Sequence, residues 1–143
     1  MPYIKIWLHT VWTTKNREPY LNPTIRSNVF KHIRSNASKN EIYIDFINGY
    51  YDHVHCLLSL NAKQSIAEVM KNIKGESSFW INKNQLLDER FSWQNDYYAA
   101  SISKKEINRT RNYIKTQEKH HQEQLLDKEL KIMVEEYGLE RFE

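Results

Sequence analysis

The stretch that decides the fold is EIYIDFINGYYDHVHCLLSL, residues 41–60. Its first part, 41–48, alternates apolar and polar side chains, which is typical of a half-buried β-strand. Residues 49–52 (GYYD) form a turn, and the apolar run 53–60 makes a second strand. The segment therefore predicts a β-hairpin.

Further strands and helices flank this hairpin on both sides. Strands are predicted at 4–13 and within 91–101, where β-branched and aromatic residues gather. Apolar residues at helical spacing predict four helices, at 23–38, from 66 to about 75, at 104–126 and at 127–137. The order β-α-β-β-α-β-α predicts an α+β fold, a ferredoxin-like or RRM-like antiparallel sheet with helices on one face, plus C-terminal helices.

Residues typical of helix ends support these boundaries. Asn22, Ser65 and Ser103 stand where N-caps belong, because their side chains accept hydrogen bonds from the first turn. Gly75 is expected to end or bend its helix, and Gly138 to stop the last one.

The composition excludes several function classes. With 143 residues and 40% hydrophobic residues, the chain is long enough for one domain with a real core. The single cysteine, Cys56, excludes a disulfide framework and a multi-cysteine zinc site. Three glycines are too few for a glycine-rich phosphate loop, so we expect no nucleotide cofactor. With no membrane-spanning run and no leader sequence, a cytoplasmic protein is expected.

Charge is unevenly distributed along the chain. The formal net charge is +3, but residues 118–143 are acidic and the rest is basic. We divide the chain into a body, 1–126, and a helical tail, 127–143, whose role the sequence leaves open. A basic body suits a phosphate-rich partner, and it is also compatible with an ordinary solvated surface.

The sequence His53-Val54-His55 places two imidazoles on one side of a strand, because successive side chains alternate. Neighbouring neutral imidazoles are good ligands for a divalent metal ion. A histidine pair of this kind can also be simple surface polarity.

Tyr113 and Gln117 are four residues apart in the predicted helix 104–126, so their side chains are neighbours. A phenol can attack phosphorus and form a covalent intermediate, and the Gln117 carbonyl oxygen could complete a metal shell begun by two histidines. The simpler interpretation makes Tyr113 a core aromatic.

Basic residues cluster with aromatic ones at two places. Lys15 and Arg17 follow Trp12, and Lys71 and Lys74 precede a Ser-Ser-Phe-Trp run at 77–80. Nucleobases stack on exposed aromatic rings, so both clusters suit single-stranded nucleic acid. We nevertheless expect at least two of the four tryptophans to lie in the core.

Four blocks of sequence together carry a resemblance. They are HTVWTTKNR at 9–17, YDHVH at 51–55, KGESS at 74–78 and YIKTQEKHH at 113–121. In this order and spacing they resemble the small HUH transposases with one catalytic tyrosine, the transposase A proteins of minimal bacterial insertion sequences. The resemblance covers about residues 3–125.

The resemblance implies an activity and a set of site residues. It implies cleavage and rejoining of single-stranded DNA at element ends, recognition of hairpins near those ends, and a homodimer acting at the bacterial nucleoid. By position, His53 and His55 match the metal-binding histidines, Tyr113 the nucleophile and Gln117 the third metal ligand. In the family, the histidine pair of one subunit meets the tyrosine helix of the other.

The cofactor implied is Mg²⁺ or Mn²⁺. Because two imidazoles and one amide carry no formal negative charge, we expect the ion to bind only together with DNA. The residues assigned to DNA contact are Lys15, Arg17, Lys71, Lys74, Ser77 and Arg109.

Alternatives remain open at this stage. They are a transposase-derived protein tied to repeated extragenic palindromes, a non-catalytic nucleic-acid-binding module, and a metal-dependent phosphodiesterase acting on small substrates. The other histidines, His9, His32, His120 and His121, are expected at the surface or behind the metal ligands.

Overall fold

The computed structural model describes residues 1–119 and 125–142. Its strands are β1 (Ile6–Thr13), β2 (Tyr43–Gly49), β3 (His53–Leu60) and β4 (Tyr98–Ile102). Its helices are α1 (Pro23–Lys39), α2 (Ile66–Lys83), α3 (Ile107–Lys115) and α5 (Leu126–Tyr137). Two short 3-10 helices, Lys15–Arg17 and Lys104–Glu106, follow β1 and β4.

The four strands form one antiparallel sheet in the order β2-β3-β1-β4. The predicted hairpin is present, since β2 pairs with β3 through a register that includes Ile47 opposite Cys56. The two central strands are β3 and β1. The candidate histidines therefore lie on a strand that is hydrogen-bonded on both edges.

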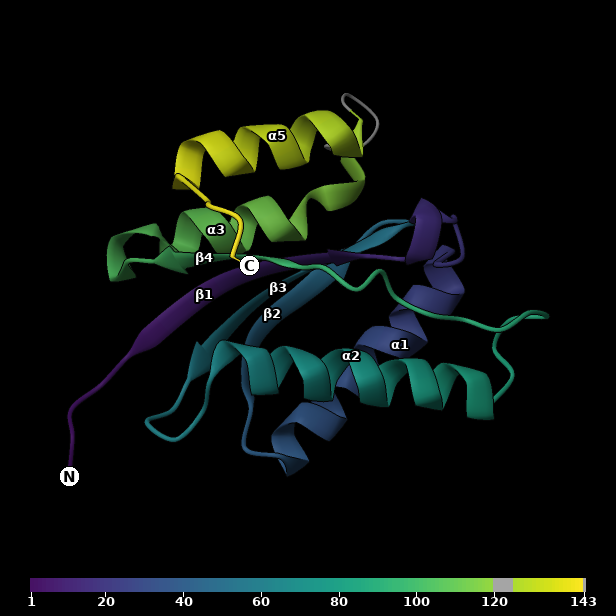
Figure 1. Cartoon of the computed structure of the whole chain (residues 1–143), viewed down its shortest axis with the longest axis horizontal. Helices are drawn as coiled ribbons and strands as arrows, with labels where there is room; N and C mark the ends of the chain where they lie inside the picture. The colour runs from purple at the N-terminus through teal and green to yellow at the C-terminus, as the bar shows by residue number, and fades with distance from the viewer. Residues whose placement is uncertain (120–124, 143) are drawn as a thin grey trace.

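Helices cover both faces of the sheet (Figure 1). α1 and α2 pack on one face over the main core, and α3 and α5 lie over the other. The predicted α+β fold, with helices on one face and additional C-terminal helices, is confirmed. Two of the four tryptophans, Trp12 and Trp93, are buried in the main core, as expected.

Two of the predicted helix caps are formed. The Asn22 side chain accepts a hydrogen bond from the backbone N–H of Ile25 at 2.9 Å. The Ser65 side chain accepts one from Glu68 at 3.2 Å. These bonds fix the starts of α1 and α2 at the predicted residues. Ser103 stands at the N-cap position of the 3-10 helix Lys104–Glu106, but its side chain accepts no capping hydrogen bond there, so its predicted capping role is wrong.

Gly75 neither ends nor borders α2, because the helix continues through it to Lys83. Space is open around the Gly75 α-carbon, so the residue faces outward from the helix. Gly49, in contrast, is required at the end of the hairpin. A β-carbon there would lie 2.2 Å from the carbonyl oxygen of His53.

The predicted long helix 104–126 is wrong, because α3 ends at Lys115 and the chain turns at Thr116 before residues 117–119 are again helical. The side-chain amide of Asn48, in β2, donates hydrogen bonds to the carbonyl oxygens of Ile114 and Lys115 at 3.0 and 3.2 Å. A side chain of β2 therefore supplies hydrogen-bond donors to two carbonyl oxygens in the last turn of α3.

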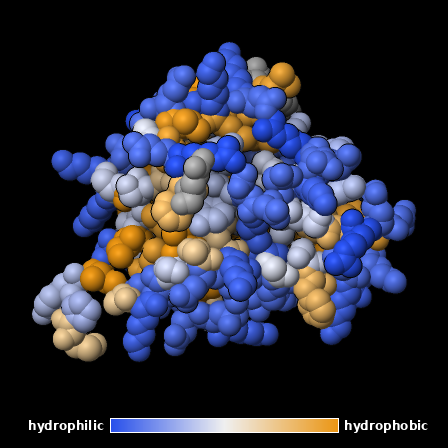
Figure 2. Space-filling model, in the orientation of Figure 1, coloured by the Kyte–Doolittle hydropathy of each residue, from blue (hydrophilic) through white to orange (hydrophobic). Residues whose placement is uncertain are grey.

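The helix α5 begins at Leu126, one residue before the predicted start, and packs on the sheet. Its residues Leu126, Leu130 and Met133 form a buried cluster with Val11 of β1. The division of the chain at residue 126 stays a prediction. Figure 2 shows a largely hydrophilic surface with apolar patches, one of them over α5. No helix within 1–119 or 125–142 has the length and apolar character needed to cross a membrane.

Candidate active site

The two histidines of the HxH sequence lie at the start of the central strand β3, on the face covered by α3 and α5. His55 pairs with Val11 of β1, and His53 with Thr13. Both imidazoles are fully buried. The sheet thus presents the two rings side by side, with centroids 5.2 Å apart, and their surface-polarity interpretation is excluded.

Tyr113 projects from α3 toward this pair. Its ring centroid lies 5.7 Å from that of His55 and 6.1 Å from that of His9. Burial raises the pKa of the Tyr113 phenol, and the charge of Glu129 and a hydrogen bond to it raise that pKa further. The phenol therefore stays protonated at neutral pH in this arrangement.

Gln117 reaches the same place from the other side of the Thr116 turn. Its Oε1 lies 3.1 Å from Nε2 of His53, and its side chain is fully buried. Its amide nitrogen donates to the carbonyl oxygen of Tyr113 at 3.4 Å. The structure thus brings together the four residues that the sequence assigned to catalysis and metal binding.

Glu129, in α5, is a member of the site that sequence reasoning missed. Its Oε1 lies 2.6 Å from Nε2 of His55 and 4.0 Å from Nε2 of His53. The side chain is 1% exposed. One signal was available, because Glu129 interrupts the apolar stripe of its helix, three residues after Leu126 and four before Met133. An acid in such a stripe needs a buried partner.

His9, in β1, lies behind His55. Its Nε2 is 2.8 Å from Nδ1 of His55, and its Nδ1 is 3.3 Å from the hydroxyl of Tyr137 in α5. Burial, and then the charge of His55, lower the pKa of His9 to about 3, so it is neutral at pH 7. This agrees with the expected place behind a metal ligand.

The remaining histidines lie elsewhere or outside the described residues. His32 lies between α1 and α2, where its Nε2 is 2.8 Å from both carboxylate oxygens of Glu76. Its ring stacks on that of Trp80 at 4.1 Å. His120 and His121 are outside the described residues.

The donor atoms at the site fit a divalent ion. Ligand atoms of His53, His55 and Glu129 lie within 4.8 Å of one another. The Gln117 carbonyl oxygen adds a further donor next to His53. Two imidazoles, a carboxylate and an amide oxygen form a mixed nitrogen and oxygen set of the kind that divalent transition metals bind. The site residues therefore fit a divalent transition metal such as Mn²⁺, one of the two ions that the resemblance implies.

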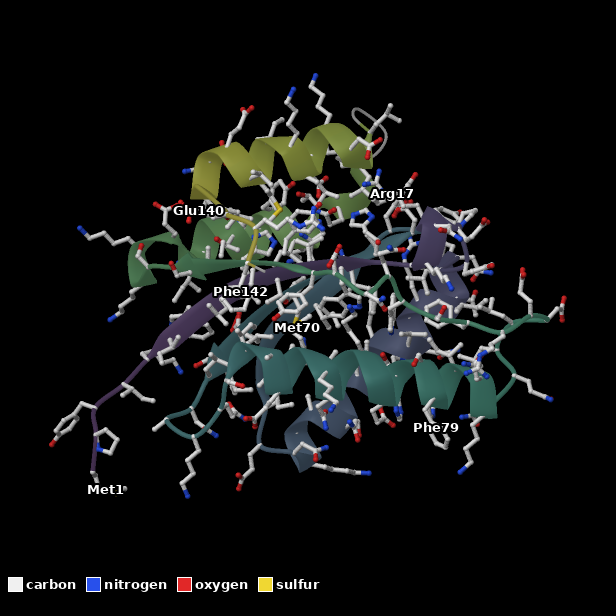
Figure 3. The ribbon with its side chains drawn as sticks, viewed as in Figure 1. Met1, Arg17, Met70, Phe79, Glu140 and Phe142 are labelled. Atoms are coloured by element: carbon white, nitrogen blue, oxygen red, sulfur yellow. The ribbon has the colours of Figure 1, made fainter. Side chains whose placement is uncertain are left out.

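Two of the predicted DNA contacts lie near the His53 end of the sheet. Lys15 and Arg17 follow Thr14, whose backbone N–H donates to Asp52, the neighbour of His53. Lys15 is exposed, and Arg17 pairs with Asp127 at the start of α5 (Figure 3).

Arg109 is exposed on α3 and pairs with Glu106 at 3.5 Å. Lys15, Arg17 and Arg109 are therefore accessible, and their DNA contacts stay predictions.

The other three predicted contacts lie on α2, on the opposite side of the sheet. Lys71 and Lys74 line a pocket of about 390 Å³ between α2 and residues 92–97. The Lys74 ammonium group already donates to three backbone carbonyl oxygens, those of residues 94–96, at 2.7–3.1 Å. Ser77 is fully buried and its Oγ accepts from Trp93 Nε1 at 2.9 Å. The surface role predicted for Ser77 is therefore wrong in this structure.

Comparison with known proteins identifies the family. The family model described as "Transposase IS200 like" matches residues 3–117. The chain belongs to the IS200-like transposase family. The resemblance to single-tyrosine HUH transposases seen in the sequence is thereby confirmed. The matched range ends at Gln117, so the transposase carries Glu129 and α5 beyond the part that the family model describes.

Individual relatives agree with this assignment. The transposase is 25% identical over 114 residues to the ISDra2 transposase TnpA of Deinococcus radiodurans, covering 76% of this chain and 81% of the relative. It matches a crystal structure of a candidate transposase from Deinococcus radiodurans with a TM-score of 0.66, at 22% identity, covering 81% of this chain and 93% of that one.

A REP-associated tyrosine transposase bound to a REP hairpin matches with a TM-score of 0.65, at 18% identity, covering 85% of this chain and 72% of that one. The two solved structures support the fold.

Proposed function

We propose that this transposase cleaves and rejoins single-stranded DNA at the ends of an insertion element through a 5′-phosphotyrosine at Tyr113. The observation that carries the proposal is the 5.7 Å separation between the rings of Tyr113 and His55 within one chain. A phenol that could become a nucleophile and a candidate metal pair thus face the same buried space. A non-catalytic binding module has no need of this arrangement.

The reaction follows from what these side chains can do. The Tyr113 oxygen forms a bond to phosphorus while the bond between phosphorus and the 3′ oxygen breaks. The phenol loses its proton and the leaving 3′ oxygen gains one, so one phosphodiester is exchanged for another. Attack of a 3′-OH from a second strand end reverses the step and joins new DNA. The bond energy is retained in the intermediate, so the reaction needs no nucleotide.

The chain's own residues supply orientation and a dry environment. His53, His55 and Gln117 would hold Mg²⁺ or Mn²⁺, which supplies charge stabilisation to the phosphate oxygens when bound. Burial of the imidazoles excludes water from them and strengthens every electrostatic interaction at the site. Burial and Glu129 raise the pKa of Tyr113, so the phenol starts protonated and the reaction needs a base that takes this proton.

The DNA partner and the assembly are part of the same proposal. The structural relative that carries a REP hairpin supports a hairpin-bearing strand as the substrate here. Lys15, Arg17 and Arg109 are accessible for its phosphates. We retain a homodimer in the proposal. A site shared between subunits is the family's arrangement, while Tyr113 and His55 of one chain are already adjacent.

Covalent trapping tests the proposal. A hairpin-bearing single strand, labelled at its 3′ end, is incubated with protein and Mn²⁺ and run on a denaturing gel. Wild type is expected to form a labelled protein–DNA species, and Tyr113→Phe to form none.

Tyr43→Phe is the matched control, because that phenol is exposed on β2 and its ring contacts Trp7, so this variant is expected to form the adduct like wild type. An adduct that persists in Tyr113→Phe would overturn the nucleophile assignment.

A further inference from the structure

The C-terminal helix α5 carries one charged side chain into the interior. Glu129 is 1% exposed, and Leu126, Leu130 and Met133 anchor the helix against Val11 and Tyr98 of the sheet. Burying a carboxylate is unfavourable unless a charged or hydrogen-bonding partner compensates for the lost water. The partners of Glu129 include the histidine pair and the Tyr113 hydroxyl, so this acid lies where a metal ion would bind.

The donor atoms converge from three separate elements. Glu129 Oε1 lies 2.6 Å from Nε2 of His55 and 4.0 Å from Nε2 of His53. Gln117 Oε1 lies 3.1 Å from the same nitrogen of His53. Strand β3, the segment after α3 and helix α5 thus each supply donors to one small volume.

The second nitrogen of each ring is held from behind. Nδ1 of His53 lies 2.8 Å from a carboxylate oxygen of Asp52, and Nδ1 of His55 lies 2.8 Å from Nε2 of His9. Metal-binding histidines usually have such partners, which fix the ring orientation and the tautomer. Both Nε2 atoms are therefore directed to the side where Glu129 lies.

A second residue of α5 extends this arrangement. When Nδ1–H of His55 donates to Nε2 of His9, Nδ1–H of His9 is directed to the Tyr137 hydroxyl, 3.3 Å away. In that tautomer the Nε2 lone pair of His55 is available to an ion. Helix α5 thus touches the histidine pair directly through Glu129 and indirectly through Tyr137.

We propose that Glu129 is a ligand of the divalent ion, so that docking of α5 completes the metal site before DNA arrives. The inference rests on the metal site of the proposed function and changes one expectation drawn from the sequence. The ligand set expected from the sequence, two imidazoles and one amide, carries no net charge. For that reason we expected the metal ion to bind only together with DNA. A carboxylate adds one negative charge to the donor set, and the charge of the ligands tunes metal affinity.

Metal binding and helix docking are then linked. An ion that binds only when α5 is in place stabilises the docked helix by mass action, and the docked helix raises the affinity for the ion. This assigns a role to the acidic tail, because the one negatively charged ligand in the proposed donor set, Glu129, belongs to it.

The test is a titration of DNA-free, full-length protein with Mn²⁺, followed by electron paramagnetic resonance of the free ion. Wild type is expected to bind one Mn²⁺ per chain. Glu129→Gln, which keeps the shape and removes the charge, is expected to bind at least ~10-fold more weakly, since even partners behind a ligand account for 10–100-fold. Glu135→Gln, exposed on the same helix, is the matched control and is expected to bind like wild type.

Hydrogen exchange gives a second readout. Mn²⁺ is expected to slow amide exchange in α5 of wild type and to leave α5 of Glu129→Gln unchanged. Two results would overturn the inference: wild type that binds Mn²⁺ only when single-stranded DNA is present, or Glu129→Gln that binds as tightly as wild type. The first result is measured on wild type alone. It therefore tests the inference even if Glu129→Gln fails to fold.

The outcome is separable from that of the proposed function. Tyr113→Phe is expected to form no covalent adduct and still to bind Mn²⁺ without DNA. If wild type binds the ion but never forms an adduct, the strand-transfer proposal fails while the role of Glu129 stands.

Discussion

The attachment of α3 to the sheet offers a quantitative test of how Tyr113 is positioned. Arg111, two residues before the tyrosine, contacts Asp45 of β2 through two hydrogen bonds, Nε to Oδ2 at 2.8 Å and Nη2 to Oδ1 at 2.9 Å. The Asp45 side chain is 13% exposed and that of Arg111 38%. We predict that Arg111→Gln loosens α3 because it leaves the Asp45 carboxylate nearly buried without its cation.

The size of the effect follows from this burial. Fully buried ion pairs lose ~3–5 kcal/mol when one partner is removed, and exposed pairs lose ~0–1 kcal/mol. The Asp45–Arg111 pair is intermediate, and its two charge-assisted bonds are the stronger kind. We therefore expect Arg111→Gln to lower the free energy of unfolding by ~2 kcal/mol. Asp45→Asn is expected to be milder, because an amide is cheaper to bury than a lone charge.

Urea unfolding of the wild type, the two single variants and the double variant measures the coupling. A coupling free energy of ~1–2 kcal/mol is expected. Arg109→Gln is the control on the same helix, since its pair with Glu106 is 81% and 50% exposed, and its loss should change the free energy of unfolding by less than ~0.5 kcal/mol. Additivity of the two single variants within ~0.3 kcal/mol would refute the reasoning.

Two further predictions concern buried polar groups on the other face of the sheet. Ser77→Ala is expected to lower the free energy of unfolding by ~1–3 kcal/mol, because the buried Trp93 Nε1–H loses its acceptor, and to leave single-strand DNA affinity unchanged at fixed salt. A stable variant with weakened DNA binding would restore Ser77 as a contact. Burial raises the pKa of the Cys56 thiol from 9.0 to about 12. Above pH 9 the thiol ionises in the unfolded chain but stays protonated in the folded one, so the folded state loses stability as pH rises. The free energy of unfolding of wild type should therefore fall by ~1.4 kcal/mol more than that of Cys56→Ala between pH 8 and 10. Equal losses in the two urea titrations would contradict the shift.

The parts of the fold that depend on local pattern could be predicted from the sequence. The hairpin and both helix caps that formed, at Asn22 and Ser65, involve residues only a few positions apart. The HxH pair was predictable because alternation along a strand places both imidazoles on one side. Tyr113 was predictable because it begins the sequence block 113–121 that carries the resemblance. Their convergence followed from the resemblance, and the structure places their rings 5.7 Å apart.

Long-range contacts account for what the sequence did not reveal. The turn at Thr116 depends on Asn48, which lies 66 residues from the nearer carbonyl that it bonds. Nothing in the helical pattern of 104–126 indicates that partner. The burial of Ser77 depends in the same way on Trp93, which lies outside the four strands and forms an isolated bridge with Thr14.

Glu129 was missed because the tail carries no recognisable motif and was interpreted only as acidic. Its place in the apolar stripe of α5 was visible, but the partner that makes its burial favourable is a histidine pair 74 residues away. Family position alone would not have found it, since the family model ends at residue 117.

The location of the imidazoles on a central strand has a consequence for how such enzymes diversify. β3 is hydrogen-bonded on both edges, whereas α3 and α5 contact the sheet through packed apolar side chains and, for α3, the hydrogen bonds of Asn48 and Arg111. One side of the site, formed by β3, is thus part of the hydrogen-bonded sheet. The other two sides, formed by α3 and α5, are helices packed against that sheet. Substitutions in the two attached helices are therefore expected to change the site at less cost to folding than substitutions in β3, so chains with the same four strands are free to differ at their C-terminal ends.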